Sequence, residues 1–472
     1  MGIEHFYNWL KTTYPNAIIP VTSLNIYSGI YIDCNHLLHN CINGSNTLDE
    51  FKQALKVTLD ILFSNFLAHD NIVIGVDGPA PYAKVILQRK RRSMMGEVSD
   101  FDSMHLTPGT QVMYKIDEFI NAYLNNLKNI YKIVKPNVEY IGSCIPDEGE
   151  LKIFTRLKEN KNKTNLVVGN DADLIVMATC MTSVNHINIL LHHKCGKELF
   201  SLDKFIDIFK KDINVNELTE SELRLDFSLM SIMQGNDYLP KLNYLNFDNA
   251  FNTYKEVVRK YKKSIMTTSI TINIEMFINF LIELMVKLPK HYRTFKMDKF
   301  NYPEIKNYFE GLLWCLNMYN TGICSMYDYV YIGKKSPCPI NLLMFCIINK
   351  NKIIETPLSN VIPLSVDYYT LLIMPKKAKA LIPKKYHGLI EGKFKYLYDR
   401  EMCNECLEYK SKLSEYHIEL IKRRKEELDN KDVREKLSKV SIDFNSHKKE
   451  KHQITFNCDD IKKIVLFISM RK

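Results

Sequence analysis

The stretch Leu166-Val-Val-Gly-Asn-Asp-Ala-Asp-Leu-Ile-Val176 decides the fold that we predict. Its apolar run, residues 166–168, is typical of a buried strand, and a helix is predicted over residues 174–179. Asp171 and Asp173 therefore follow the carboxyl end of a strand, which is the edge where open α/β sheets bind ligands. For this stretch alone, a helix cap followed by a solvated first-turn acid is the more ordinary interpretation.

The same arrangement recurs along the chain, which favours a shared acidic site. Strands are predicted at Gly29-Ile-Tyr-Ile-Asp33, at Ile72-Val-Ile-Gly-Val-Asp77 after a helix over residues 48–69, and at residues 138–141 and 186–191. One helix is predicted to begin near residue 148, and another, over residues 225–233, precedes Gly235-Asn-Asp. The acids beside these turns are Asp33, Asp77, Glu148, Glu150, Asp171, Asp173 and Asp237.

A rim of neighbouring carboxylates predicts a metal site. Burying several unpaired carboxylates side by side costs several kcal/mol unless cations neutralise them. The set resembles the ligand shell of two hard divalent ions, Mg²⁺ or Mn²⁺, with water and phosphate completing the coordination. Two such ions suit phosphodiester cleavage, because one activates a water nucleophile while the other stabilises the departing oxyanion.

A basic row follows Asp77. In the predicted helix after Asp77-Gly-Pro-Ala-Pro, four side chains stand at i, i+4, i+7 and i+8 and so share one face. Guanidinium groups match phosphate oxygens in bidentate fashion, so this face predicts a phosphate pocket. The alternative is an ordinary basic surface helix. The four residues are Lys84, Gln88, Arg91 and Arg92.

Composition indicates a globular protein with two or three domains in its 472 residues. The 64 Lys and Arg exceed the 54 Asp and Glu, which weakly favours a polyanionic partner. The most apolar helical segment, residues 277–288, carries Glu283 and Lys287, and the N-terminus is unlike a signal peptide, so we expect no membrane association and an intracellular location. Cys403 and Cys406 form a Cys-x-x-Cys pair without a second pair at zinc spacing, so reduced thiols are predicted.

Together these motifs resemble the Xrn family of 5′-to-3′ exoribonucleases, within the superfamily of flap-endonuclease-like metal nucleases. The Thr-Pro-Gly loop at residues 107–109 is typical of the Xrn branch. Residues 311–314, 319–325 and 363–391 are similar to the family's second region. The strongest matches, in chain order, are MGIEHFYNWL, IYIDCNHLLHNC, DGPAPYAKVILQRKRR, FDSMHLTPGTQVM, PDEGELKI, GNDADLI and GNDYLP.

The resemblance implies a site and a substrate. The seven acids would hold two Mg²⁺ ions, and Lys84, Gln88, Arg91 and Arg92 would bind the 5′-phosphate. His39 and Trp314 would stack on bases or guide the strand. The implied substrate is single-stranded RNA with a 5′-monophosphate, degraded to nucleoside 5′-monophosphates, and no protein partner is indicated. The chain departs from the family pattern at positions other than these acids, namely Asp147, Leu151, Asn170, Met104, His105 and Lys241.

The expected fold is an α/β nuclease core of the PIN/flap-nuclease type, with a mostly parallel central sheet flanked by helices. We place this catalytic domain at residues 1–255, a mainly helical second region at 256–427 and a charged tail at 428–472. The resemblance implies a short member without the family's further C-terminal domains, in the cytoplasm or nucleus. Two alternatives are a structure-specific 5′-flap DNA nuclease, disfavoured by the glycine-free YLPKLNYLNFDNAF after Asp237, and a non-catalytic RNA-binding decay scaffold.

Overall fold

The computed structural model describes residues 3, 5–21, 25–95, 98–130, 136–160, 163–191, 198–289, 300–333, 335–398, 404–425, 429–451 and 456–470. Its contacts divide it into two compact units. Unit 1 comprises Met1–Lys84 and Val112–Val366, and unit 2 comprises Val85–Gln111 and Asp367–Lys472. Among the residues described, none of the helices combines the length and the apolar character needed to cross a bilayer.

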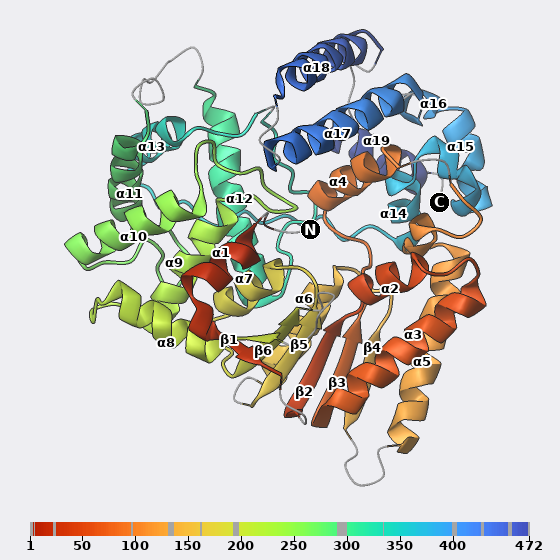
Figure 1. Ribbon diagram of the computed structural model, residues 1–472, viewed down its shortest axis with the longest axis horizontal. Helices are drawn as coiled ribbons and strands as arrows, with labels where there is room; N and C mark the ends of the chain where they lie inside the picture. The colour runs from red at the N-terminus through yellow and green to blue at the C-terminus, as the bar shows by residue number, and fades with distance from the viewer. Residues whose placement is uncertain are drawn as a thin grey trace. The chain divides into compact units, whose positions relative to one another are not determined.

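Unit 1 is built on a seven-stranded sheet with the order β1-β7-β6-β5-β2-β3-β4 (Figure 1). The pairs β6–β5, β5–β2, β2–β3 and β3–β4 are parallel, while β7 runs antiparallel to both β1 and β6. The mostly parallel α/β fold class is thereby confirmed. The strands are β1 (Ile18–Pro20), β2 (Asn25–Asp33), β3 (Phe66–Gly75), β4 (Asn137–Ile141), β5 (Asn165–Gly169), β6 (Ile187–Leu191) and β7 (Glu198–Ser201).

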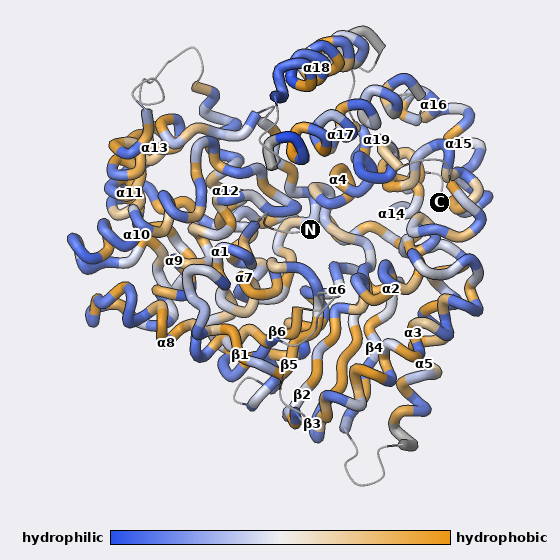
Figure 2. The backbone as a smooth tube through the Cα atoms, in the orientation of Figure 1, coloured by the Kyte–Doolittle hydropathy of each residue, from blue (hydrophilic) through white to orange (hydrophobic). Residues whose placement is uncertain are grey.

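The central strands are buried on both faces. All five residues of β5 are buried, as are the last seven of β2, and Figure 2 shows these strands as hydrophobic. Such continuous apolar runs are typical of parallel sheets covered by helices on both sides. On one face Tyr31, Val73 and Val167 join the main core, which includes residues of helices α6 (Gly149–Leu157), α7 (Asp173–Cys180), α8 (Leu202–Ile213) and α9 (Glu220–Ile232).

Helices make up most of the remainder of unit 1. Helix α3 contacts β3, and α5 lies beside α3 in Figure 1. Helices α11 and α13 pack on each other, and α12 packs on α7 and α9. The bounds are α1 (Phe6–Thr13), α2 (Asn35–Ile42), α3 (Leu48–Asn65), α5 (Gln111–Ile130), α10 (Phe247–Tyr261), α11 (Ile274–Lys287), α12 (Tyr302–Thr321) and α13 (Pro339–Ile348).

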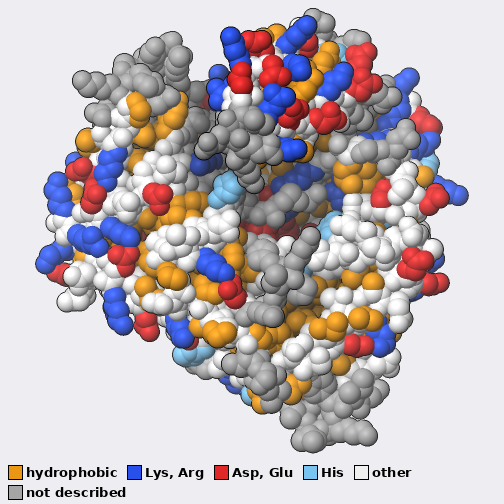
Figure 3. Space-filling view, viewed as in Figure 1, with side chains coloured by type: hydrophobic (Ala, Val, Ile, Leu, Met, Phe, Trp, Pro, Cys, Tyr) orange, Lys and Arg blue, Asp and Glu red, His pale blue; other side chains and the backbone are white. Residues whose placement is uncertain are grey.

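Unit 2 is mainly helical. Helix α4 (Tyr82–Ser93) begins in unit 1 and ends in unit 2, where buried Arg89 donates hydrogen bonds to the carbonyls of Leu372 and Met374. Acidic and basic side chains alternate over α18, as Figure 3 shows, so this charge-rich segment has no single sign. The remaining helices are α14 (Val366–Ile373), α15 (His387–Glu391), α16 (Lys395–Tyr398), α17 (Asn404–Lys425), α18 (Lys431–Lys451) and α19 (Cys458–Ser469).

Several element boundaries differ from the sequence prediction. The helix predicted over residues 48–69 ends at Asn65, because residues from Phe66 onward pair with β2 and form β3. Strand β3 ends at Gly75 rather than at Asp77, and the edge strand β1 and its neighbour β7 were not predicted. Cys403 lies outside the described residues.

The three-domain division stays a prediction about regions of sequence. Its boundary at residue 255 falls inside α10, and the one at 427 lies outside the described residues. The region predicted to be mainly helical contains α11 to α17, and the predicted tail contains α18 and α19.

Candidate active site

The carboxyl ends of neighbouring parallel strands bring acids from distant parts of unit 1 together. Asp33 is the last residue of β2, and Asp77 follows the end of β3 by two residues. Asp171 and Asp173 follow β5, and Asp173 is the first residue of α7. Because β5, β2 and β3 are adjacent and parallel, their ends meet at one edge of the sheet.

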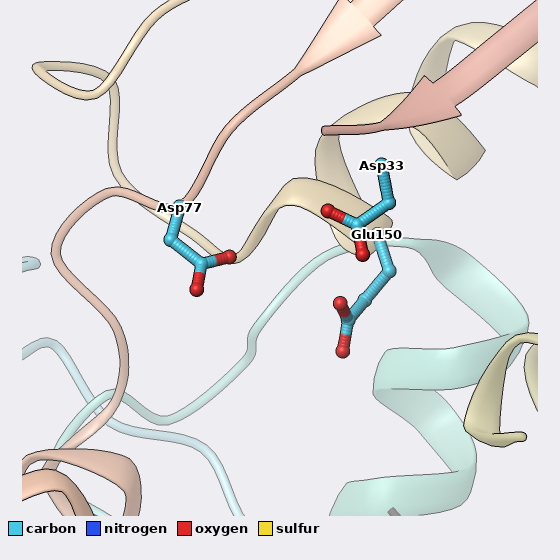
Figure 4. A group of neighbouring side chains, drawn as sticks. All are labelled: Asp33, Asp77 and Glu150. Atoms are coloured by element: carbon cyan, nitrogen blue, oxygen red, sulfur yellow. The ribbon is translucent and has the colours of Figure 1, made fainter. Parts of the chain in front are cut away.

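Asp33, Asp77 and Glu150 form the tightest group, which we call the open triad. Each offers a carboxylate oxygen, and these oxygens lie within 4.8 Å of one another. Figure 4 shows the three side chains arriving from a strand end, a loop and a helix. The close approach of α6 requires Gly149, since a Cβ at that position would lie 2.6 Å from Asp33 Oδ1.

Neutral donors hold the open triad in shape. The Asn35 side-chain amide donates to Asp33 Oδ1 at 2.8 Å and to Asp77 Oδ1 at 2.6 Å. The backbone N–H of Gly149 also donates to Asp77 Oδ1, at 2.9 Å. Because none of these partners carries a full positive charge, they orient the carboxylates without neutralising them.

Burial and mutual repulsion raise the pKa of two members of the triad. The pKa of Asp33 rises to about 7, first because the carboxyl is buried and then because Asp77 lies beside it. The pKa of Glu150 is well above its usual value, again through burial first and then through Glu148 and Asp33. A cation placed among these oxygens would relieve both effects.

Glu148 and Asp237 form a second group, the lysine-bridged pair. Lys84 Nζ donates to Asp237 Oδ2 at 2.6 Å and makes an ion pair with Glu148 Oε1. The hydroxyl of Tyr238 donates to the other oxygen of Glu148. Burial raises the pKa of Glu148 to about 7, although Lys84 acts to lower it. Burial acts to lower the pKa of Lys84, but Glu148 and Asp237 hold it well above its usual value.

Asp171 and Asp173 interact electrostatically with both groups, Asp171 with Asp33 and Asp173 with Asp237 and Lys84. Asp171 Oδ1 accepts the backbone N–H of Asp173 at 3.2 Å, but the N-cap of α7 is Ala172, which makes no side-chain cap. The local interpretation of a solvated first-turn acid is wrong for Asp173. Asp173 is buried and accepts the backbone N–H of Ile3 at 3.0 Å. Burial, followed by Asp171 and Asp237, raises the pKa of Asp173 well above its usual value.

This donor set fits hard divalent cations. Carboxylate oxygens are the ligands that Mg²⁺ and Mn²⁺ prefer, and the triad supplies several within reach of one ion. Burial and mutual repulsion, which raise the pKa values of these carboxyls, are effects that a bound cation would offset. Which acids bind ions stays a prediction.

The predicted phosphate-binding residues have different partners. Lys84 is engaged by the lysine-bridged pair in unit 1. In unit 2, Arg92 donates to Gln88 Oε1 and to Thr107 Oγ1, both at 2.9 Å, and Arg91 is half-buried. The contact with Thr107 links the basic row to the Thr-Pro-Gly loop, for which the sequence alone gave no local role. Binding of phosphate by these residues stays a prediction.

The two residues predicted to stack on bases differ in exposure. His39 is exposed on α2. Trp314 on α12 is completely buried, with its ring 4.6 Å from that of Tyr329 in a stacked arrangement and 5.2 Å from that of Tyr238 edge-on. A base therefore has no access to the Trp314 ring in this conformation, and its role in guiding RNA stays a prediction.

Sequence reasoning missed two residues that hold the acids in place. Asn35 stands two positions after Asp33, and an Asp-x-Asn at a strand end could have signalled a side chain that returns to the carboxylate. Tyr238 directly follows Asp237, but its partner Glu148 lies 90 residues away. That second contact had no signal in the local sequence.

Comparison with known proteins agrees with the motifs. Residues 1–97 and 93–193 match the family model described as the XRN 5′-3′ exonuclease N-terminus. The chain is 25% identical over 332 residues to 5′-3′ exoribonuclease 1 of Saccharomyces cerevisiae, covering 58% of this chain and 21% of that protein. It is 23% identical over 346 residues to human 5′-3′ exoribonuclease 1, covering 60% and 20% respectively. The match thus spans about a fifth of the length of these relatives.

Among solved structures, the catalytic core of Rad2 in complex with DNA substrate aligns with 73% of this chain and 92% of its own, at 13% identity and a TM-score of 0.38. The sequence match to the family model spans residues 1–193, a range that includes Asp33 and Asp173. The chain is a homologue of the 5′-3′ exoribonucleases, and its residues 1–193 correspond to the N-terminal region of the XRN 5′-3′ exonucleases.

Proposed function

We propose that this protein is a Mg²⁺-dependent 5′-to-3′ exoribonuclease. Its substrate would be single-stranded RNA with a 5′-monophosphate, and its products nucleoside 5′-monophosphates. The observation that carries the proposal is the open triad at the carboxyl edge of the sheet, inside the region that matches the XRN model. The relatives named 5′-3′ exoribonuclease support the choice of RNA and of the direction. We further propose that it acts inside the cell.

The acids would hold two ions between them. Asp33, Asp77 and Glu150 would bind one, and Glu148, Asp171, Asp173 and Asp237 would complete the site for another. Bound divalent ions supply a nucleophilic hydroxide and charge stabilisation in phosphodiester hydrolysis. Asn35 and the Gly149 N–H fix Asp77 Oδ1 and leave Oδ2 for a cation.

The basic row on α4 would select the end of the RNA. Lys84, Gln88, Arg91 and Arg92 would bind the terminal phosphate, because arginine forks pair with phosphate oxygens and lysine supplies a mobile point charge. A pocket fitted to one phosphoryl group would exclude a cap or a triphosphate. Removal of one nucleotide then leaves a new 5′-monophosphate, so the product end is again a substrate.

The test compares RNA ends. Purified protein in Mg²⁺ should degrade 5′-monophosphorylated RNA, spare capped and 5′-triphosphorylated copies of the same sequence, and stop when EDTA is added. Asp77→Asn should abolish degradation. Asp70→Asn, the same substitution at a surface ion pair on β3, should retain it. Equal degradation of all three RNA ends would refute the phosphate pocket.

The same preparation discriminates the alternatives. Faster cleavage of a 5′-flap DNA than of single-stranded RNA would favour a DNA flap nuclease. Unchanged turnover in Asp77→Asn, combined with RNA binding, would favour a non-catalytic scaffold. The triad argues only against the scaffold, because hydrolysis of either nucleic acid would use its acids. The match to the XRN 5′-3′ exonuclease model favours RNA over flap DNA.

A further inference from the structure

Lys84 occupies a place that a metal ion would compete for. Its ammonium lies between Glu148 and Asp237, with only 10% of its side chain exposed. Tyr238 occupies the second oxygen of Glu148. Both oxygens of Glu148 are therefore already engaged, Oε2 by the hydrogen bond from the Tyr238 hydroxyl and Oε1 by the charged ammonium of Lys84.

The open triad has no ion pair of this kind among the described residues, although Lys84 acts on Glu150 and Asp77 at longer range. Its hydrogen-bond donors are the Asn35 amide and backbone N–H groups, and within the described parts of the chain no lysine or arginine makes an ion pair with Asp33, Asp77 or Glu150. An ion can enter the triad without displacing a charged group. One seated on Glu148 and Asp237 would have to displace Lys84, because two cations at hydrogen-bonding distance repel strongly in a buried site.

We propose that Lys84 makes the second metal ion conditional on the 5′-phosphate, an inference that rests on the proposed function. Without substrate, Lys84 neutralises Glu148 and Asp237 and keeps the second ion out. A terminal phosphate attracts the ammonium, which sits on a flexible four-carbon chain, and the freed carboxylates accept the ion. Lys84 is thus a specificity-determining residue, since an RNA without the phosphate leaves the site short of one ion.

Thermodynamic linkage makes this proposal quantitative. If phosphate raises the affinity for the second ion by some factor, the ion must raise the affinity for phosphate by the same factor. Couplings between sites typically amount to about 5-fold to 150-fold. The model therefore demands reciprocity between two separate titrations, and neither of them involves RNA cleavage.

The test measures Mn²⁺ binding to the full chain by calorimetry and by the electron paramagnetic resonance of free Mn²⁺. The probe for the phosphate is adenosine 5′-monophosphate, with adenosine as the control that lacks it. We expect about one Mn²⁺ per chain alone or with adenosine and about two with the monophosphate, with a coupling of about tenfold or more. Two ions of similar affinity without any phosphate would overturn the proposal.

Lys84→Met removes the charge while keeping the length of the side chain. We expect this variant to bind about two Mn²⁺ whether or not the monophosphate is present. Lys163→Met, which removes a lysine from a surface ion pair with Asp70, should keep the wild-type dependence on phosphate. A Lys84→Met protein that still binds one ion would refute the proposal, and if this variant does not fold, the wild-type titrations decide alone.

The outcome is separable from that of the RNA assay. A protein that degrades 5′-monophosphorylated RNA but binds both ions without phosphate retains the proposed function and loses this role of Lys84. A protein that shows phosphate-dependent ion binding but no RNA degradation retains the role of Lys84 and loses the proposed reaction.

Discussion

The open triad and the lysine-bridged pair are both buried acidic groups of unit 1, but their partners differ in charge. Asp33 and Asp77 are held by an amide and a backbone N–H, whereas Glu148 and Asp237 share an ammonium. When its carboxyls are ionised, the first group holds negative charges together without an ion pair, which costs stability. The second is largely neutralised by the chain itself. The number of acids in a group therefore does not by itself decide how readily the group binds a metal ion.

Removing one acid from each group should produce the largest effects, with opposite signs in stability. Asp33→Asn keeps the acceptor for Asn35 but removes a charge that the triad does not compensate, so the melting temperature of the ion-free protein should rise. Asp237→Asn deprives Lys84 of a partner, so the melting temperature of the ion-free protein should fall. Both should lower kcat by about a thousandfold, since charge stabilisation by an ion is worth several kcal/mol.

Thermal denaturation in EDTA and a single-turnover RNA assay measure these effects. The surface variant Asp70→Asn should match the wild type in kcat. If Asp33→Asn and Asp237→Asn changed the melting temperature in the same direction, the distinction between the two groups would be wrong.

The pH dependence of stability should sharpen the comparison next. The pKa values of Asp33 and Glu148 are about 7 in the folded protein and near 4 when unfolded, so the folded state holds their protons more tightly. The stability that comes from this tighter proton binding is complete below about pH 4 and is lost as the pH rises to about 7. The ion-free protein should therefore melt at progressively lower temperature across this window, and Mg²⁺ should restore stability at pH 8 far more than at pH 5.

Asp226 provides the control for that experiment. Burial raises its pKa to about 7 as well, but its partners are Tyr254 and the backbone N–H groups of Ile265 and Met266. The contribution of Asp226 to the fall of melting temperature with pH should not respond to Mg²⁺ and should disappear in Asp226→Asn. A Mg²⁺-induced rise in melting temperature that is equal at pH 5 and pH 8 would contradict the assignment of the raised pKa values to an ion site.

Much of the fold and the site could be predicted because both follow from local patterns. Apolar runs such as residues 166–168 mark buried strands, and parallel strands deliver the acids that follow them to one edge. What escaped prediction depends on long-range pairing. Phe66 begins a strand because β2 lies beside it, and the ring of Trp314 is buried because Tyr238 and Tyr329 enclose it. Strand β2 is separated in sequence from Phe66 by helices α2 and α3, and Tyr238 and Tyr329 lie outside the helix that carries Trp314.

Tyr238→Phe should have a smaller effect, on the lysine-bridged pair only. The substitution removes the hydroxyl that donates to Glu148 and keeps the ring against Trp314. Loss of such a partner of a predicted ligand typically costs about 10-fold to 100-fold, and we expect about tenfold in kcat with little change in KM for RNA. Tyr254→Phe removes an equivalent bond to Asp226 and should lower the melting temperature without changing kcat.

The smallest effect on RNA binding is expected at Trp314, although the family resemblance implies a role there. Stacking of a base on an aromatic side chain is worth about 1–3 kcal/mol, so loss of a stacking ring should raise KM severalfold or more. Trp314 has no exposed surface, and its neighbours belong to the framework behind Glu148. Trp314→Leu should therefore lower the melting temperature and leave KM nearly unchanged, whereas His39→Ala, on an exposed face of α2, should raise KM. A clear rise in KM for Trp314→Leu at temperatures where it is fully folded would mean that RNA binding exposes the ring, and the structure would then represent a closed form of this region.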